Sequence, residues 1–213
     1  MNYFKSPILC SFGISVLLLL SGCSTVINWV RQEVPQSCQI KTEILECPDI
    51  QTLTLYDQFT LLGEFDVLWV SNKIKRLFVD MRAEHLSFSE SKKSILLKNE
   101  LEENKHFATF YILSLFTIPL ASRSEWNITL SVDGEKYTLI ELLPVELPYE
   151  YQYLFAYRYN NFKQAYKARF SMMRDSQSVD IQSAGQEMVM TFHKLDTSVS
   201  KKDHGFITWK LQM

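Results

Sequence analysis

The chain has 213 residues and a nearly balanced charge, with 22 basic residues, 24 acidic residues and a net charge of −2 at pH 7. This balance argues against a nucleic-acid-binding protein, which usually carries a basic surface. Hydrophobic residues make up 46% of the sequence, which argues against intrinsic disorder and is enough for the core of one domain of ordinary size.

Residues 1–22 have the pattern of a secretory signal peptide. A short polar start contains Lys5, an apolar run extends from Pro7 to Leu20, and small residues precede Cys23. The apolar run is shorter than the roughly 20 residues of a transmembrane helix. We expect cleavage before Cys23, which removes one basic residue and leaves 21 basic and 24 acidic residues.

The segment Leu20-Ser21-Gly22-Cys23 resembles the lipobox of bacterial lipoproteins. The resemblance implies that the Cys23 thiol receives a diacylglyceryl group, that the new amino terminus is acylated, and that acyl chains such as palmitate hold the protein on a membrane. Family members that stay on the inner membrane tend to have Asp after the cysteine. Ser24 at this position therefore implies the outer membrane, with the protein facing the periplasm. The alternative is an ordinary signal peptide with a chance cysteine at the cleavage site.

Cys38 and Cys47 remain in the mature chain, after a tether over 24–36. Cysteines in an oxidising compartment usually pair, and a disulfide across so short a loop could contribute roughly 2–3 kcal/mol of stability. We expect residues 23–50 to form the anchor, the tether and a disulfide hairpin. A free or regulatory pair is the alternative, although the redox spacing C-x-x-C is absent.

The next segments favour a strand and then helices. Ile50 to Tyr56 alternates apolar and polar residues, as a strand does. Apolar residues then recur at helical spacing, which predicts a helix from about Tyr56 to Leu86 with a break near Gly63 or Ser71-Asn72. Its polar side is expected to carry Lys73, Lys75, Arg76 and Arg82.

A second helix is predicted over Ser89–Lys105, with Ser91 as a possible N-cap. Its acidic residues are interpreted as a solvated face: Glu100, Glu102 and Glu103. The pattern changes at Phe107, because Phe107 to Ile118 is nearly all apolar, β-branched or aromatic and Pro119 ends the run. Such a run is typical of a central strand that is covered on both faces.

The remaining segments predict short antiparallel strands. Trp126 to Val132 alternates, Asp133-Gly134 supplies a tight turn, and Lys136 to Leu142 runs back as the second strand of a hairpin. Tyr149 to Tyr159 places aromatic residues on odd positions, which also favours a strand. Further strands are predicted over 164–173, 179–181, 187–195 and 206–211.

Together these elements predict an α+β fold, in which an N-terminal helical segment packs on an antiparallel β-sandwich-like domain. The single globular domain is expected to span 51–213, mainly helical over 51–106 and mainly β over 107–213. The stretch from Arg76 to Phe170 is also loosely similar to uncharacterised envelope lipoproteins, a likeness that implies no activity. The matching pieces are Trp126–Leu130, Asp133-Gly134 and Ala165–Phe170.

One stretch could bind an anion or an acidic partner. Tyr151 to Arg174 has no acidic residue and carries five cations interleaved with aromatic residues: Arg158, Lys163, Lys167, Arg169 and Arg174. Outside the cytosol the plausible anions are lipid headgroups, glycan phosphates or an acidic protein. The alternative is a sheet with a buried aromatic face and a basic face in water, because alternating strands produce this pattern automatically.

No residue set predicts catalysis. The sequence has neither a G-x-S-x-G elbow nor a Gly-rich phosphate loop, and its four histidines lack the spacing of zinc ligands: His85, His106, His193 and His204. The carboxylate pairs Glu64/Asp66 and Glu146/Glu150 are weak candidates, since a glycosidase needs two carboxylates at a defined separation. We therefore expect no catalytic residues, no metal and no cofactor.

The leading hypothesis is a non-enzymatic envelope protein, held on the membrane by acyl chains, that binds an envelope protein or helps to assemble a complex. The rival is a periplasmic hydrolase or glycan-acting enzyme with a site made from distant residues. A third hypothesis is a ligand or lipid carrier that uses the aromatic face as a pocket wall.

Overall fold

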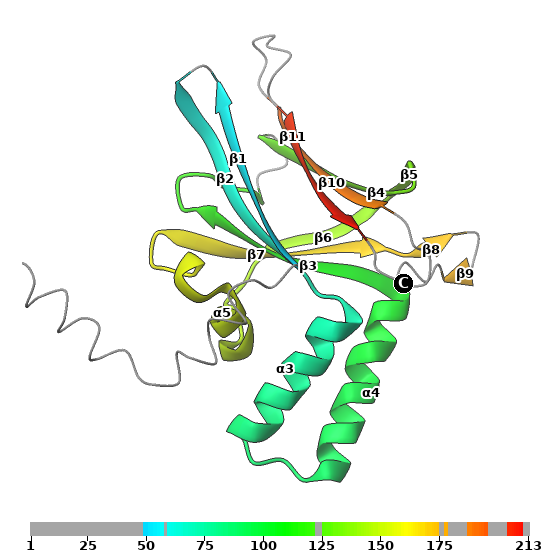
Figure 1. The fold of residues 1–213 in the computed structure, drawn as a ribbon. Helices are drawn as coiled ribbons and strands as arrows, with labels where there is room; N and C mark the ends of the chain where they lie inside the picture. The colour runs from blue at the N-terminus through cyan, green and yellow to red at the C-terminus, as the bar shows by residue number, and fades with distance from the viewer. Residues whose placement is uncertain are drawn as a thin grey trace, which may run out of the picture. The chain divides into compact units, whose positions relative to one another are not determined.

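The described part of the chain folds as two antiparallel sheets and three α-helices, which is the α+β class that the sequence predicts (Figure 1). The computed structural model describes residues 49–57, 59–121, 125–174, 177–178, 187–195 and 204–210. The chain divides into two units, Met1–Ile44 and Leu45–Met213, and every described residue belongs to the second. The predictions for the signal peptide, Cys23, Cys38 and Cys47 lie outside the described residues.

The larger sheet has five strands in the order β1-β2-β3-β7-β6. These strands are β1 (Ile50–Asp57), β2 (Thr60–Trp69), β3 (Phe107–Leu115), β6 (Leu139–Pro144) and β7 (Lys163–Ser171). The smaller sheet has the order β11-β10-β4-β5. Its strands are β4 (Trp126–Val132), β5 (Glu135–Tyr137), β10 (Glu187–Lys194) and β11 (His204–Lys210). Two short strands, β8 (Met173–Arg174) and β9 (Gln177–Ser178), pair separately.

Both sheets contribute to one aromatic-rich core. Alternate residues of each strand point into it, so Phe65 of β2 stacks on Phe192 of β10 at 4.6 Å and meets the edge of Trp126 of β4 at 5.1 Å between ring centroids. The start of β1 is bonded to both sheets. The carbonyl of Asp49 accepts from Trp69 N of the larger sheet at 3.0 Å and from Trp209 Nε1 of the smaller sheet at 3.2 Å.

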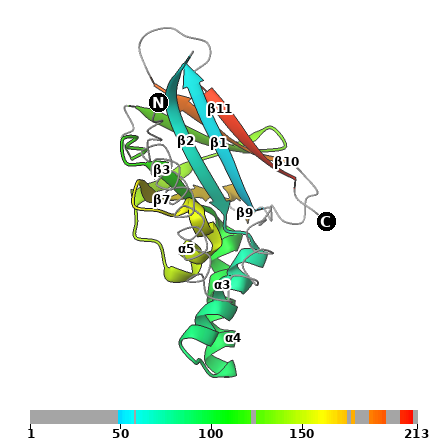
Figure 2. The same ribbon diagram turned by 60° about the vertical axis from the view of Figure 1, so that its left-hand side comes forward.

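Two helices, α3 (Asn72–His85) and α4 (Glu90–His106), form a hairpin that extends away from the sheets between β2 and β3 (Figures 1 and 2). Each begins at a serine N-cap: Ser71 accepts from Ile74 N, and Ser89 accepts from Lys92 N. The second predicted helix is confirmed, but its N-cap is Ser89 and not Ser91. The third helix, α5 (Tyr149–Phe155), continues into a 3-10 turn, η1 (Ala156–Arg158).

The predicted helix from Tyr56 to Leu86 is wrong in its first half. Residues 60–69 form β2, and helix begins only at Asn72, where the sequence suggested a break. The last residues of β2 are buried on both faces. A strand of this kind has a nearly continuous apolar run, and some of its residues fall at helical spacing by chance.

The predicted strand over Tyr149–Tyr159 is also wrong, because this segment forms α5 and η1. Its buried residues Tyr151, Leu154 and Phe155 follow the helical offsets i, i+3 and i+4, so two periodicities coexist in the same stretch. The odd-numbered aromatic residues therefore do not share one face.

Most other strand predictions are confirmed, including the central position of β3 and the Asp133-Gly134 hairpin between β4 and β5. The return strand of that hairpin is shorter than predicted. β5 ends at Tyr137, and the chain crosses to the larger sheet as β6. The strand expected over 179–181 lies outside the described residues.

Candidate functional site

The polar residues of interest lie on the outer face of the larger sheet, which we define as the face turned away from the core. Side chains alternate along a strand, so the residues between the core positions of β2, β3 and β7 occupy this face. Polar residues that the alternation places on this face include Glu64, Asp66, Thr109, Tyr111, Lys163, Lys167 and Arg169. The predicted cation patch therefore forms part of a sheet face that also receives carboxylates from other elements.

The four described cations of the predicted patch are all paired with carboxylates. Arg158 and Lys163 contact Asp66 at one end of β7, while Lys167 and Arg169 approach Glu103 further along it. The side chain of Arg174 lies outside the described residues. The basic stretch in the sequence is thus balanced by acidic residues from β2, β6 and α4, and the described cations do not form a free basic face in water.

A groove of about 550 Å³ lies at the Lys163 end of the outer face. Its lining, which defines the groove from here on, is Thr52, Glu64, Asp66, Leu115, Tyr157, Arg158, Asn160, Phe162 and Lys163. Lys163 Nζ donates to Glu64 Oε1 and to Asp66 Oδ2, both at 2.6 Å. Thr52 Oγ1 donates to Asp66 Oδ1 at 2.6 Å, and Arg158 Nε lies 3.6 Å from the same oxygen.

This arrangement fixes the charge state of the lysine. Burial alone lowers the pKa of Lys163, but its hydrogen bonds to Asp66 and Glu64 outweigh burial and leave the pKa raised. A lysine that acts as a nucleophile or general base needs a lowered pKa instead. Lys163 is therefore a permanent cation that holds two carboxylates together.

Aromatic side chains stand exposed around the groove. Tyr157 is 70% exposed and Phe162 is 77% exposed, although large apolar side chains are usually covered. Lys163 also lines a second depression of about 320 Å³, called the side depression, which is bordered by Phe116 and Tyr159. Ala156, just before Tyr157, has a φ of 50°, a left-handed conformation that costs a non-glycine residue energy.

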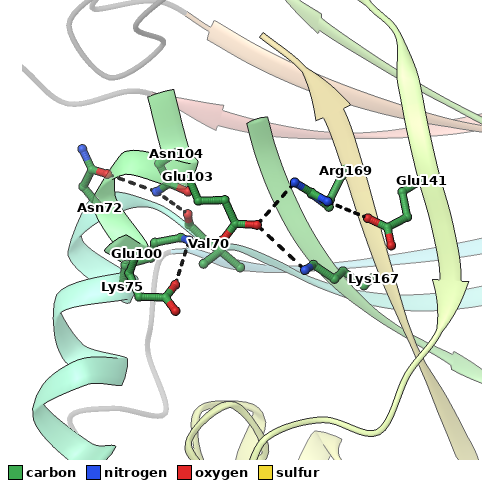
Figure 3. A network of polar contacts seen from close by, with 9 residues as sticks. All are labelled: Val70, Asn72, Lys75, Glu100, Glu103, Asn104, Glu141, Lys167 and Arg169. Atoms are coloured by element: carbon green, nitrogen blue, oxygen red, sulfur yellow. Dashed lines mark hydrogen bonds and ion pairs between the residues drawn. The ribbon is translucent and has the colours of Figure 1, made fainter. Parts of the chain in front are cut away.

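A second polar cluster joins the helical hairpin to the sheet (Figure 3). Lys75 of α3 is only 2% exposed, and its Nζ lies 2.9 Å from Glu100 Oε2 and 2.7 Å from Glu103 Oε2. Glu103 also approaches Arg169 Nη2 at 3.6 Å, and Arg169 Nη1 donates to Glu141 Oε2 at 3.0 Å. The chain of charges runs from α3 through α4 and β7 to β6.

Two tyrosines beside this cluster are held neutral. Tyr111 and Tyr151 pack with ring centroids 4.6 Å apart next to a cavity of about 210 Å³ that Lys75 also lines. Burial, together with nearby glutamates, raises the pKa of Tyr111 to about 12 and the pKa of Tyr151 well above its usual value. Thr109 Oγ1 borders the same cavity and has no hydrogen-bond partner among the residues that the structure describes. Ordered water commonly satisfies such a group.

The sequence indicated only part of these clusters. It singled out Glu64 and Asp66 as a weak pair and Lys163 as part of the cation patch, but it did not predict the contact between them, which joins Asp66 to a lysine 97 residues further along the chain. Lys75 was placed on the polar side of its helix, and this is wrong, because it is buried. Its spacing to Phe78 and Val79 matches the buried face and could have revealed it.

Glu100 and Glu103 were expected on a solvated face, but both are paired with Lys75. The histidines, which the sequence did not predict to bind a metal, include one close pair. His193 and His204 face each other across β10 and β11 with ring centroids 5.4 Å apart, and burial, His204 and Lys136 lower the pKa of His193. Within the described ranges, no group of three or more potential metal ligands comes together.

Over the same ranges, none of the helices combines the length and the apolar character needed to cross a bilayer. Comparison with known proteins identified no matching family model, no matching curated protein and no matching solved structure.

Proposed function

We propose that the chain is an exported bacterial lipoprotein, anchored through Cys23, that works in the cell envelope by binding a partner rather than by catalysis. The support for the anchor is the Leu20-Ser21-Gly22-Cys23 segment with its signal-like leader. Ser24 supports the outer membrane as the location, with the folded part in the periplasm and Cys38 and Cys47 joined as a disulfide.

In this proposal the folded part is a β-sandwich-like domain with helices on the outer face of its larger sheet, and the groove is its binding surface. One observation carries the proposal: exposed Tyr157 and Phe162 border a cavity whose charges are already paired with each other. Exposed aromatic side chains that line a cavity together with a few fixed polar groups are typical of recognition sites.

The alternatives have less support. In a glycosidase, one carboxylate must give or take a proton and the other must reach the sugar, but both oxygens of Asp66 are engaged by Lys163 and Thr52. A carrier that uses the aromatic face as a pocket wall would need that face to be open. Tyr166 and Phe170 instead pack in the core.

The anchor is tested by growing cells with labelled palmitate. The wild type should carry the label, and the Cys23→Ala variant should not. Absence of label from the wild type, or its retention in the variant, would refute the lipoprotein proposal.

The binding surface is tested by incorporating a photoreactive phenylalanine analogue at Phe162 in living cells. The control position is Phe206 on β11, which is 64% exposed and lies outside the groove lining. We expect a defined adduct with an envelope component from position 162 and none from 206. Equal adducts from both positions, or none from either, would contradict a binding role for the groove.

A further inference from the structure

We infer that the groove and the side depression bind an uncharged oligosaccharide; this inference rests on the proposed function and names the ligand class of its binding surface. The exposed aromatic residues, the paired charges of the groove and the lysine that the two depressions share each bear on the ligand.

The rim offers several aromatic platforms and not a single one. Phe116 is 60% exposed beside the side depression, and Tyr157 and Phe162 are more exposed beside the groove. One face of Tyr157 has the Arg158 guanidinium 4.9 Å from the ring centroid. A sugar ring presents a face of C–H groups that packs on such a platform, while its hydroxyl groups seek polar partners.

Backbone hydrogen bonds hold the main chains of two of these aromatic residues in place. The amide of Phe116 donates to the Phe162 carbonyl at 3.0 Å, and the Phe162 amide donates to Asn160 Oδ1 at 3.0 Å. Phe116 and Phe162 are therefore held next to each other before any ligand arrives. Such preorganisation lowers the entropy cost of binding.

The polar floor selects against a strongly charged ligand. The groove lining has two acidic residues, Glu64 and Asp66, and two basic residues, Arg158 and Lys163, which pair with them. Among the residues that line the side depression, the only further charged residue is Glu146. In the groove, an anion or a cation would have to displace an existing ion pair, whereas a hydroxyl group can donate to or accept from these side chains without doing so.

The two depressions share Lys163 as a lining residue and have volumes of about 550 and 320 Å³. Aromatic residues border both parts. A repeating ligand, with one unit against each platform, fits this layout better than a single small molecule.

The test is isothermal titration of the full chain, purified from membranes in a detergent without a sugar headgroup, with chitotetraose, cellotetraose and maltotetraose. At least one should bind with a Kd below ~1 mM. Phe162→Ala and Tyr157→Ala should each weaken binding about tenfold or more, while Phe206→Ala leaves it unchanged. Raising the ionic strength from about 0.05 M to about 0.5 M should change the Kd less than about twofold, because the ligand is uncharged.

The inference is overturned if none of the three oligosaccharides binds at about 10 mM, or if neither groove variant weakens binding. It is also overturned if binding falls steeply with salt. Thermal unfolding of each variant serves as the folding control. A protein adduct at position 162 without oligosaccharide binding would overturn the inference and leave the proposed function standing, so the two failures can be told apart.

Discussion

Lys75 illustrates how a single buried charge can organise two elements. Its ammonium is almost inaccessible to water, but Glu100 and Glu103 are only partly covered, so the pair sits at the boundary between a buried and a surface ion pair. Removing one partner of a buried pair usually costs about 3–5 kcal/mol, and surface pairs contribute about 0–1 kcal/mol. Because the two glutamates are only partly buried, we expect the stability loss on removing Lys75 to lie between these two limits.

We predict that Lys75→Met lowers the free energy of unfolding at pH 7 by about 2 kcal/mol, whereas Lys73→Met, on the exposed side of the same helix, changes it by less than about 0.5 kcal/mol. Urea unfolding followed by circular dichroism measures both. If Lys75→Met leaves the free energy of unfolding unchanged, the ion pairs of Lys75 contribute no net stability to the fold.

The ion pair between Lys75 and Glu103 should make the stability loss of Lys75→Met depend on pH. Burial alone raises the pKa of Glu103, but hydrogen bonding and attraction to Lys75, with smaller effects of Lys167 and Arg169, leave the pKa lowered. A carboxyl group with a lowered folded-state pKa contributes stability above its unfolded pKa of about 4.3, and this contribution is lost as pH falls. The difference between the wild type and Lys75→Met should therefore shrink below about pH 4. A difference that grows on acidification would contradict this account.

At the scale of elements, the β4–β5 hairpin shows a turn fixed by local chemistry. Asp133 and Gly134 have φ angles of 50° and 82°, as a two-residue hairpin turn requires, and the sequence predicted the turn from these two residues. A Cβ on Gly134 would meet no atom within 4 Å, so any cost of adding one is backbone strain alone.

We predict that Gly134→Ala lowers the free energy of unfolding by about 1–2 kcal/mol, and that Gly134→Asn costs less than half as much, because Asn tolerates the left-handed region. Chemical denaturation of the two variants against the wild type provides the measurement. Equal losses for Ala and Asn would mean that the strain argument is incorrect.

Whether an element could be predicted from the sequence depended on how many of its faces are buried. Strands with one buried face, such as β4 and β7, alternate clearly and were found at nearly the right bounds. β2 is buried on both faces at its end, so alternation is lost and helical spacing arises by coincidence. In α5 a helix was mistaken for a strand. Tyrosines at every second position suggested a strand, although the buried residues follow the helical spacing i, i+3 and i+4.

The groove could not be predicted for a different reason. Its central contact joins Lys163 of β7 to Asp66 of β2, and β3 lies between these strands in the sheet. Only the strand order brings the two residues together, and a single sequence does not determine that order. The sequence showed the cations of the 151–174 stretch, but the carboxylates that neutralise them come from distant segments.

For the whole molecule, the proposed disulfide between Cys38 and Cys47 is a testable link between the anchor and the domain. Intact-mass measurement of the purified chain should show a gain of about two mass units on reduction, as expected for a single disulfide. The Cys38→Ala/Cys47→Ala double variant should show no such gain and should unfold at a lower denaturant concentration. Two free thiols in the untreated protein would contradict the disulfide.

If Cys23 anchors the chain as proposed, a mechanical load from the membrane would enter the domain near Asp49. The carbonyl of this residue is tied to β2 of one sheet and to Trp209 of the other, at the point where β1 begins. Tension applied through the preceding residues would therefore act on hydrogen bonds to both sheets, and not only on those that join β1 to β2. Under the proposed anchor, we expect this double contact to resist peeling of β1 better than a contact with one sheet alone.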